Sequence, residues 1–465
     1  MTLLDELLQA DGNRIVTFDG QRAWTLTQLR QSALLLARQL TALPVQRWAI
    51  CTGDSYHFCQ ALLACAMAGR AVVLPGHQRL AGLQELLDQD AFDGLLCDEP
   101  LPLPCPLQPI DAVTACEPLP ATEAIATLAP EITLYTSGST GQPNGITKPW
   151  ALLEAEVRTQ IALWHQHLEG ARLFSSVSHQ HIYGLLFRIL LPLALGIPFA
   201  RSQTDYPEQL ASQKEPWVLV SSPAFLSRLD PALAGIGCRL IFSSGGPLAY
   251  EDARQSAALL GPLPVEIYGS SETGGIGWRQ SAAPDIPWTP FAGVIVSCDE
   301  EQTLLLRSPF MDEAEPWVGS DRIALCDDGD KGAAGRFHLL GRRDRIVKLE
   351  EKRISLDDVE LRIKALEGIL DAAVLPLEQG GRQVLGAALV LSQQGVQSFT
   401  RLGHGAFLQQ LRRQLHPWLE PVALPRSIRL FPALPLTGAG KRDGVALRQA
   451  FDQTPLQQPG VPTDG

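Results

Sequence analysis

Hydrophobic and polar residues follow helical and strand-like spacings through the first part of the chain. Apolar residues at steps of three and four positions predict a helix over 26–40, and Thr25 followed by Gln28 has the spacing of a capping box at its start. Short apolar runs over 48–51 and 71–74 predict buried strands on either side of a second helix. This alternation favours an α/β fold with a substantially parallel sheet.

The pattern changes near residue 344. A charged segment over 342–353 leads into predicted helices and strands over 356–366, 372–375, 387–391 and 407–415. Their order indicates a small α+β unit. We therefore expect a large α/β domain over 1–343, a small α+β domain over 344–451, and a disordered tail over 452–465, where prolines and polar residues dominate.

Composition excludes several classes of protein. Hydrophobic residues make up 45% of the chain and charged residues 19%, which is ordinary for a globular protein and excludes a disordered, collagen-like or coiled-coil chain. The net charge of −12 argues against a nucleic-acid partner. Apolar stretches are too short for a membrane span, and the N-terminus has no basic segment typical of a signal peptide. The nine cysteines are scattered without a C-x-x-C pair, so we expect reduced thiols and a cytoplasmic protein.

The segment 134–148 combines glycines with small hydroxyl residues and ends at Lys148. Glycine lets backbone N–H groups approach a phosphate closely, and small hydroxyls add hydrogen-bond donors without bulk. The segment differs from the G-x-x-x-x-G-K-[ST] phosphate loop because no Lys-Ser/Thr pair follows. On these features alone, a phosphate-binding loop and a flexible turn are both open interpretations.

The same segment resembles the T-S-G-[ST]-T-G-x-P-K-G signature of the adenylate-forming superfamily, which includes acyl-CoA synthetases, adenylation domains and luciferases. Segments similar to that family's other motifs follow in order: Ser243-Ser-Gly-Gly-Pro-Leu248, Tyr268-Gly-Ser-Ser-Glu272-Thr, Gly319-Ser-Asp321, Gly341-Arg342-Arg-Asp344 followed by Lys348, and Pro435-Leu-Thr-Gly-Ala-Gly-Lys441. The resemblance implies the adenylate-former architecture, in which a large AMP-binding N-terminal domain is followed by a small, mobile α+β C-terminal lid domain.

The resemblance also implies a two-step reaction with ATP and Mg²⁺. A carboxylate attacks the α-phosphate of ATP to give an acyl-adenylate and pyrophosphate, and a thiol then displaces AMP to form a thioester. The implied triphosphate contacts are Thr136, Ser137, Gly138, Ser139, Thr140, Gly141 and Lys148. The other implied nucleotide contacts are Ser244, Gly245, Gly246, Tyr268, Gly269, Ser270, Ser271, Asp321 and Arg342.

Four residues match positions with catalytic, metal or hinge roles in the family. Glu272 matches the magnesium-associated glutamate, and Lys441 matches the lysine that bridges the carboxylate and the α-phosphate during adenylation. Asp344 falls at the family's domain hinge, whose rotation would bring Lys348 to the site for the thiol step. Outside this context, Lys441 would be a solvated lysine and Asp344 a turn carboxylate.

The acid pocket is also implied by resemblance. The segment Ser178-His-Gln-His181-Ile-Tyr183 is similar to the His-aromatic element of 4-coumarate:CoA ligases. Tyr183 would stack on a substrate ring and His181 would close the pocket, while Gly274 and Gly275 would leave room for the acyl group. A packed core histidine and tyrosine is the alternative.

Two residues depart from the family pattern. Asn144 stands where the family has a lysine in the phosphate loop, and Lys148 is either its replacement or a solvated residue. Glu351 stands where a glycine lets the backbone approach the pantetheine arm, which puts the CoA route in question. We therefore expect a free-standing ligase that transfers a carboxylic acid, aromatic by resemblance to aryl-polyene-type ligases, to a separate acyl carrier protein. Free CoA as acceptor is the alternative, and a nucleotide- or acyl-AMP-binding protein that lost catalysis is the third hypothesis.

Overall fold

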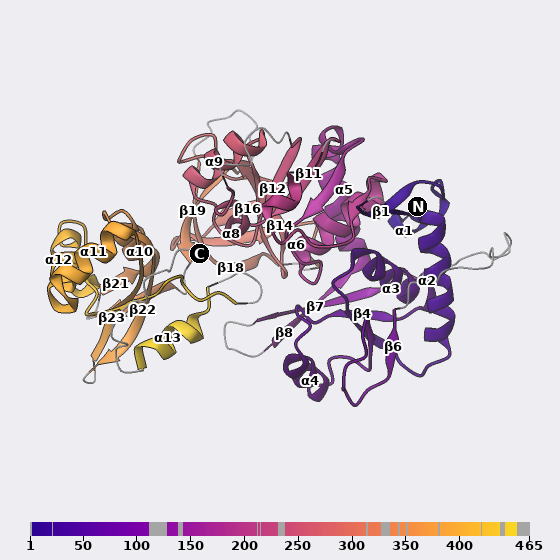
Figure 1. Cartoon of the computed structure of the whole chain (residues 1–465), viewed down its shortest axis with the longest axis horizontal. Coiled ribbons are helices and arrows are strands. Elements are labelled where there is room, and N and C mark those ends of the chain that lie inside the picture. The colour runs from indigo at the N-terminus through magenta and orange to yellow at the C-terminus, as the bar shows by residue number, and fades with distance from the viewer. Residues whose placement is uncertain are drawn as a thin grey trace. The chain divides into compact units, whose positions relative to one another are not determined.

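The computed structural model of the chain describes residues 2–20, 22–110, 128–137, 143–211, 213, 215–230, 238–312, 315–326, 335–342, 345–349, 352–379, 382–419, 421–437 and 442–452. Contacts divide the chain into two units (Figure 1). Unit 1 comprises Met1–Val296, Leu306–Trp317 and Cys326–Arg336, and unit 2 comprises Ser297–Leu305, Val318–Leu325 and Phe337–Gly465.

Within the described residues, unit 1 contains a nine-stranded sheet. Its strands lie in the order β15 (Thr289–Pro290), β14 (Gly274–Gln280), β13 (Val265–Ser270), β12 (Leu240–Ser243), β11 (Trp217–Ser221), β9 (Arg172–Ser175), β10 (Phe199–Ala200), β1 (Ile15–Asp19) and β2 (Arg22–Thr25). The middle strands of this sheet pair in parallel with one another, in the order β1, β10, β9, β11, β12 and β13. Antiparallel strands complete both edges, with β2 beside β1 and with β14 and β15 beyond β13. The central strand β11 is buried along its whole length, which is typical of parallel strands covered on both faces.

A second, six-stranded sheet lies in the same unit among the described residues. Its order is β6 (Leu107–Pro109), β5 (Gly94–Cys97), β3 (Arg47–Cys51), β4 (Ala71–Leu74), β7 (Glu131–Ser137) and β8 (Pro143–Pro149). All neighbours are parallel except the β7–β8 hairpin. The strands β3 and β4 confirm the two short strands predicted from the first apolar runs, and the parallel pairing confirms the α/β prediction.

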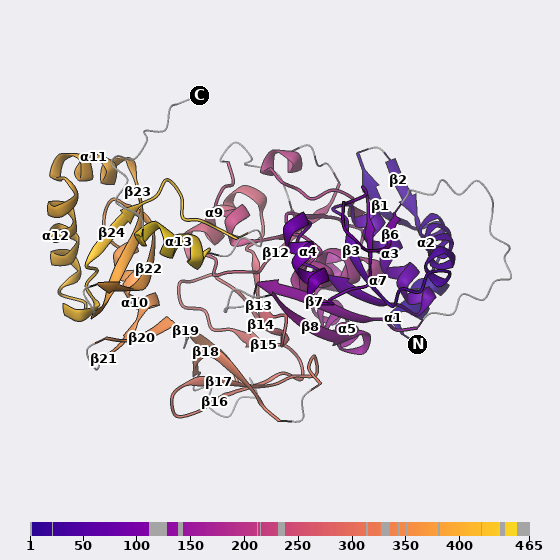
Figure 2. The ribbon, with the colours of Figure 1, turned by 90° about the horizontal axis from the view of Figure 1, so that it is seen from below.

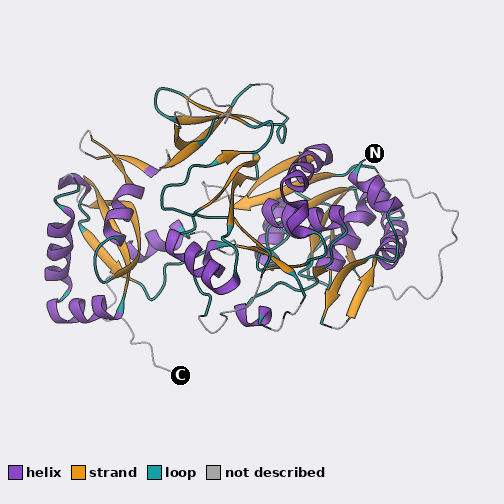
Figure 3. Cartoon of the chain, turned by 90° about the horizontal axis from the view of Figure 1, so that it is seen from above, coloured by secondary structure: helices purple, strands orange, loops and turns teal. Residues whose placement is uncertain are grey.

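Helices pack around the strands of unit 1 (Figure 3). They are α1 (Leu3–Gln9), α2 (Leu26–Thr41), α3 (Ser55–Ala68), α4 (Leu80–Asp88), α5 (Trp150–Leu168), α6 (Ile182–Gly184), the π-helix η1 (Leu185–Leu190), α7 (Leu191–Leu195), the 3₁₀-helix η2 (Pro207–Leu210), α8 (Pro223–Leu226) and α9 (Tyr250–Leu260). The predicted capping box is present, because Thr25 and Gln28 exchange side-chain and backbone hydrogen bonds at the start of α2. Among the described residues, no helix has the length and apolar character required to cross a bilayer.

In the part of unit 2 that the structure describes, three small sheets combine with helices. Its strands are β16 (Ile295–Cys298), β17 (Thr303–Arg307), β18 (Trp317–Leu325) and β19 (Phe337–Arg342) in one sheet, the hairpin β20 (Ile346–Leu349) and β21 (Lys352–Ser355), and β22 (Ile369–Gln379), β23 (Arg382–Leu391) and β24 (Ser427–Leu430) in the third. Its helices are α10 (Leu356–Lys364), α11 (Gln393–Leu402), α12 (His404–Leu415), the 3₁₀-helix η5 (Pro421–Ala423) and α13 (Gly444–Asp452). Figure 2 shows α11 and α12 beside the β22–β24 sheet.

The α+β prediction for this region is confirmed, although the helices α11 and α13 and the strands β20, β21 and β24 were not predicted. Val359 and Ile363 on α10 and Leu411 and Leu415 on α12 pack with apolar residues of β22 and β23 in one core. Helix α11 was not predicted, although Ser392 caps it by accepting the N–H of Gly395. Contacts define the two units by the residue ranges given above, and these ranges interleave between residues 297 and 337. The predicted boundary at 343 and 344 lies outside the described residues, as does the predicted tail beyond 452.

Candidate functional site

The first candidate element is the loop between β7 and β8. The two strands place Thr136 opposite Asn144 and Ser137 opposite Pro143. Thr136 is half-buried and Asn144 is exposed. The other predicted phosphate contacts of this loop lie outside the described residues, namely Gly138, Ser139, Thr140 and Gly141, together with the side chain of Ser137. The strands that carry the loop are therefore defined, and its binding role stays a prediction.

Lys148, near the end of β8, points into the interior of unit 1. Its side chain is buried, with 4% exposed. Its Nζ donates to the backbone carbonyl of Glu272 at 2.7 Å and to that of Phe310 at 3.0 Å. A buried ammonium is costly unless hydrogen-bonded, and these carbonyls satisfy it. Lys148 is therefore not a solvated residue in this structure, and its role as a replacement cation for the triphosphate stays a prediction.

Glu156 on α5 is a second buried ionisable group, and the sequence analysis missed it. Only 4% of the residue is exposed, and its Oε1 accepts the backbone N–H of Gly275 at 2.8 Å. Burial raises the pKa of the Glu156 carboxyl to about 7, while the Gly275 hydrogen bond and the charge of Lys148 act in the opposite direction. The available signal was the position of Glu156, which lies three residues after buried Leu153 and next to buried Val157 on the same face of α5.

Both buried groups contact the hairpin formed by β13 and β14. Its register pairs Tyr268 with Gly277 and Ser270 with Gly274. The hydroxyls of Ser270 and Thr273 are 3.1 Å apart, and the Ser270 N–H donates to the Thr273 hydroxyl at 3.2 Å, so the turn is braced internally. The predicted contacts Gly269 and Ser271 also lie here, exposed and half-buried respectively. Glu272 is exposed at this turn, which leaves its carboxylate available while its carbonyl is held by Lys148.

The glycines after Glu272 pack closely against other parts of unit 1. Gly274 has φ of +68°, and a Cβ atom added to it would lie 2.6 Å from Oε2 of Glu156. A Cβ atom at Gly275 would lie 2.7 Å from the ring of Phe291. The space that side chains would take is therefore filled by protein atoms. In this structure the absent side chains of Gly274 and Gly275 leave room for Glu156 and Phe291, and a contact of these glycines with an acyl group stays a prediction.

The loop after β12 carries the next predicted nucleotide contacts. Ser244 Oγ donates to the carbonyl of Ile267 at 2.8 Å, which ties this loop to β13. Gly245 has φ of +91°, which glycine adopts readily, and both Gly245 and Gly246 are exposed with open space where a Cβ would lie. Their backbone is therefore accessible to a ligand.

These loops share one edge of the nine-stranded sheet. The neighbouring strands β9, β11, β12 and β13 run parallel, so the segments that follow them emerge at the same edge. In open α/β sheets, ligands bind outside the carboxyl ends of the strands. The segments following β9, β12 and β13 contain the predicted acid-pocket and nucleotide residues, which places these motifs on one rim.

The predicted acid-pocket residues follow β9. His181 is half-buried and precedes α6, and a Cβ atom added to Gly76 would lie 3.3 Å from its ring. The Tyr183 ring lies 5.0 Å from that of Phe187, and burial raises the pKa of its phenol well above the ordinary value. The adjacent His179 is a core residue. Its Nε2 lies 2.8 Å from the Thr52 carbonyl, and burial lowers its pKa well below the ordinary value, so it is uncharged at neutral pH.

Unit 2 carries the remaining predicted site residues. Asp321 on β18 lies opposite Arg342 on β19; Asp321 is half-buried and Arg342 is exposed. Lys348 lies in β20, and its side chain is outside the described part of the chain. Asp344 and Lys441 also lie outside the described residues. The roles of these residues therefore stay predictions.

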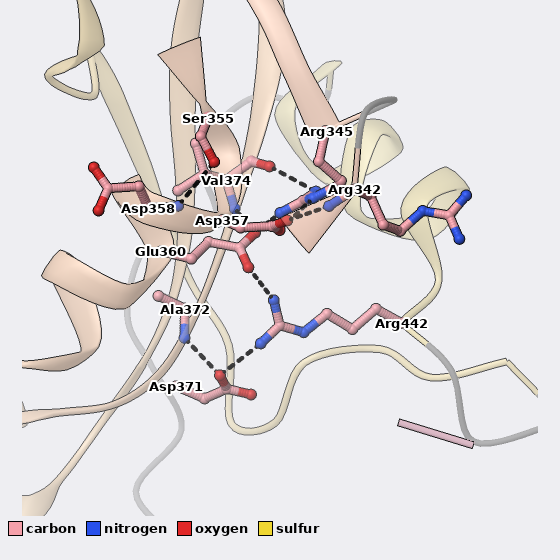
Figure 4. Close-up of polar contacts among 10 residues, drawn as sticks. All are labelled: Arg342, Arg345, Ser355, Asp357, Asp358, Glu360, Asp371, Ala372, Val374 and Arg442. Carbon is pink, nitrogen blue, oxygen red and sulfur yellow. Dashed lines mark hydrogen bonds and ion pairs between the residues drawn. The ribbon is translucent and has the colours of Figure 1, made fainter. Parts of the chain in front are cut away.

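The described residues that flank Asp344 and Lys441 meet in one charged network, which Figure 4 shows. Glu360 on α10 accepts from Arg345, from Arg442 at 2.7 Å and from the Val374 N–H at 2.7 Å. Arg442 also donates to Asp371 at 2.8 Å. Arg345 donates to Asp357 at 2.9 Å, and Asp357 accepts the Arg342 N–H at 3.2 Å. The sequence analysis missed this network, because residues so far apart in the chain share no local pattern.

Comparison with known proteins identifies the family. The model of the AMP-binding enzyme family matches residues 4–302. The chain belongs to the AMP-binding enzyme family. This confirms the predicted adenylate-forming family and the prediction that the chain is an enzyme.

Curated relatives of this AMP-binding enzyme are ligases. The chain is 28% identical over 321 residues to 4-coumarate–CoA ligase of Cereibacter sphaeroides, covering 66% of this chain and 69% of that protein. It is 27% identical over 342 residues to a probable 2-succinylbenzoate–CoA ligase of Mycobacterium tuberculosis, covering 69% and 84%.

Solved structures confirm the predicted fold. ATP-bound MatB from Rhodopseudomonas palustris matches with a TM-score of 0.78 at 20% identity, covering 97% of this chain and 99% of that one. The O-succinylbenzoate CoA synthetase MenE from Bacillus subtilis, in complex with AMP, matches with a TM-score of 0.76 at 16% identity, covering 98% of each chain.

Proposed function

We propose that this AMP-binding enzyme uses ATP to convert a carboxylic acid, an aromatic one, into an acyl-adenylate and then transfers the acyl group to a thiol. The observation that carries the proposal is the parallel pairing of β9, β11, β12 and β13, since the predicted acid-pocket segment and the predicted nucleotide segments near Ser244 and Tyr268 follow the carboxyl ends of three of these strands. The curated relatives, which are named as acid–CoA ligases, support the same class of reaction.

The rim residues suit a nucleotide and its metal. The exposed backbone at Gly245 and Gly246 offers N–H groups without side-chain obstruction. The exposed Glu272 carboxylate is the type of oxygen ligand that Mg²⁺ prefers, and its backbone is fixed by Lys148. When bound, Mg²⁺ would neutralise phosphate charge. We assign Glu272 to hold it, and Thr136 with the β7–β8 loop to hold the phosphates.

The acid would lie near the segment that follows β9. Tyr183 supplies an aromatic ring that can stack against a substrate ring, and the adjacent His181 is half-buried. His179 stays neutral in the core and so adds no charge beside the substrate carboxylate. The names of two relatives, for 4-coumarate and for 2-succinylbenzoate, support an aromatic acid.

The proposal has two versions, which differ in the molecule that carries the accepting thiol: free CoA or an acyl carrier protein. The relatives are named as CoA ligases, which supports free CoA. Transfer to the phosphopantetheine thiol of an acyl carrier protein rests on Glu351 in place of the family's glycine, and this residue lies outside the described part of the chain. CoA and the carrier present the same pantetheine thiol, so the reaction class is common to both.

Unit 2 would supply one lysine for the adenylation step and another for the thiol step. By resemblance, Lys441 stabilises the adenylation transition state, Asp344 is the hinge and Lys348 acts in the thiol step. Asp321 would accept hydrogen bonds from the ribose hydroxyls, with Arg342 beside it. Preorganised positive charge at the α-phosphate lowers the barrier, because negative charge develops there.

An acid-dependent pyrophosphate-exchange assay tests the proposal. The purified chain is incubated with ATP, Mg²⁺, labelled pyrophosphate and a panel of aromatic and aliphatic acids. We expect exchange with at least one aromatic acid, and no exchange with any acid would favour a nucleotide-binding protein that has lost catalysis. Adding CoA or a pantetheinylated carrier protein to the active mixture then identifies the acceptor by which one gives a thioester.

A further inference from the structure

Lys148 and Glu156 are buried ionisable groups that the proposed chemistry does not use. They lie on β8 and α5, which are adjacent in the chain, and each has only 4% of its surface exposed. Burying a charged or titratable group is unfavourable unless specific partners compensate it. The groups that hydrogen-bond to Lys148 and Glu156 therefore indicate which part of the structure these two residues hold in place.

The two groups converge on the same turn. Lys148 Nζ donates to the carbonyl of Glu272 at 2.7 Å, and Glu156 Oε1 accepts the N–H of Gly275 at 2.8 Å. These contacts hold the turn through its backbone from both sides of the Thr273–Gly274 pair. Lys148 also binds the carbonyl of Phe310 at 3.0 Å, which ties the turn to the segment before β18.

The turn is adapted to accept the carboxylate of Glu156. Gly274 adopts a positive φ of +68°, and a Cβ atom there would lie 2.6 Å from Oε2 of Glu156. A Cβ atom at Gly275 would lie 2.9 Å from Oε1. The absence of side chains at both positions, the hydrogen bond to Gly275 and the burial of Glu156 thus describe one fitted arrangement.

We propose that Lys148 and Glu156 are positioning residues that fix the Glu272 turn, so that the exposed Glu272 carboxylate is preorganised for the Mg²⁺ of the nucleotide. The inference rests on the proposed function for the role of Glu272. Neither residue touches the substrate in this proposal, because both act through the backbone. Residues that orient metal ligands from behind commonly change metal affinity by 10–100-fold when replaced.

The test compares three single variants of the full chain: Lys148→Met, Glu156→Gln and Glu266→Gln. Glu266 is a matched control, because it is a buried carboxylate on the same β13–β14 hairpin but pairs with Arg279 away from the turn. The Mg²⁺ concentration that gives half-maximal pyrophosphate exchange is measured for each. We expect Lys148→Met to raise it about tenfold or more, Glu156→Gln to raise it less, and Glu266→Gln to leave it unchanged.

A second readout does not depend on turnover. Hydrogen–deuterium exchange of peptides spanning 265–280 should be faster in Lys148→Met and Glu156→Gln than in the wild type, whereas Glu266→Gln should not accelerate exchange at the turn. Unchanged local exchange in Glu156→Gln together with an unchanged Mg²⁺ midpoint would overturn the inference, and Glu156→Gln serves this purpose even where Lys148→Met does not fold.

The outcome for the wild type separates the two proposals. Wild-type exchange with no acid would refute the proposed function, and Mg²⁺-dependent binding of a fluorescent ATP analogue then replaces the exchange assay. Equal Mg²⁺ dependence of that binding in the wild type and in Glu156→Gln would refute the positioning role. A shifted Mg²⁺ dependence confined to the Lys148 and Glu156 variants supports it.

Discussion

Glu156 in unit 1 and Glu360 in unit 2 are both buried glutamates on helices, and each accepts a backbone N–H group from a neighbouring strand. Glu156 accepts from Gly275 of β14 at 2.8 Å, and Glu360 accepts from Val374 of β22 at 2.7 Å. Their charged partners differ. Glu360 binds two arginines, whereas the cation that contributes to the electrostatics of Glu156 among the described residues is Lys148, whose Nζ is hydrogen-bonded to carbonyls.

This difference shows what each carboxylate does in its unit. Burial raises the pKa of Glu156 to about 7, so its charge is only partly compensated, and its main contact is with a backbone turn. For Arg345, burial would lower the pKa, but Glu360 and Asp357 outweigh it and raise the pKa. Guanidinium groups make fork-shaped contacts with carboxylates, so Glu360 joins side chains from distant segments. We infer that Glu156 shapes a turn and that Glu360 joins segments.

The comparison predicts its largest effect for Glu360 in unit 2, whose replacement should lower the free energy of unfolding. Glu360→Ala leaves Arg345, Arg442 and the Val374 N–H without their shared carboxylate. Because the two arginines are partly exposed and keep Asp357 and Asp371, we expect a cost of about 2–3 kcal/mol. We expect a decrease of that size in the free energy of unfolding, measured by urea denaturation of the full chain. A decrease below about 1 kcal/mol, the range of surface ion pairs, would show that Glu360 is not the centre of the network.

The next effect concerns Lys441, which precedes the Arg442 that Glu360 binds. Lys441→Ala should reduce acid-dependent pyrophosphate exchange by about 10²–10³-fold, because a preorganised charge at the developing negative centre is lost. Thiolysis of a chemically prepared acyl-adenylate should be spared, since Lys441 is assigned to the first step alone. Equal loss of both half-reactions would instead indicate a damaged unit 2, and unchanged exchange would remove Lys441 from the mechanism.

The sequence predicts local elements well and long-range contacts poorly. The capping box at Thr25 and the strand over 71–74 depend on residues close together in the chain, and the structure contains both. Motifs near Ser244 and Tyr268 were also found, because each is a short loop with its own composition. Helix α11 was missed even though Val396, Phe399 and Leu402 have helical spacing, because glutamines and Gly395 interrupt its start.

The contacts of Lys148 and Gly274 at the candidate site could not be predicted from the sequence, for a common physical reason. Lys148 follows a glycine-rich loop, so a phosphate contact was the natural prediction, but its direction depends on where β8 places it relative to Glu272. Gly274 suggested open space, yet Glu156 fills that space from a helix far away in the sequence. Tertiary packing decides both cases, and no local pattern carries that information.

A smaller, pH-dependent effect should distinguish the two glutamates. The folded state raises the pKa of Glu156 from 4.5 to about 7, so the neutral carboxyl is favoured in the fold. Its stabilising contribution is complete below pH 4.5 and is lost as the pH rises through about 7. The Glu156→Gln variant keeps a neutral side chain, so it should lack this loss, which we expect to be about 1–3 kcal/mol.

The measurement is the urea midpoint of wild type and variant at pH 5 and at pH 8. The wild type should lose more stability than the Glu156→Gln variant between these two pH values. Lys148 is the charged residue that contributes to the Glu156 shift, so Glu156→Gln in a Lys148→Met background serves as a control for coupling. Parallel changes with pH in wild type and variant would mean that Glu156 is ionised throughout this range.

The smallest effect is expected for an exposed ion pair on the same helix as Glu156. Arg158 on α5 binds Glu154 at 2.7 Å and Glu6 at 2.9 Å, and about 44% of its side chain is exposed. Water and salt screen such pairs, so Arg158→Ala should lower the free energy of unfolding by only about 0.3–0.5 kcal/mol, and less at high salt. The measurement is urea denaturation at low and high ionic strength. A salt-independent loss above about 1 kcal/mol would show that the exposed Arg158 ion pairs stabilise the protein more than surface ion pairs usually do. Burial would then not explain why Glu156 and Arg158, on the same helix, differ in their contribution to stability.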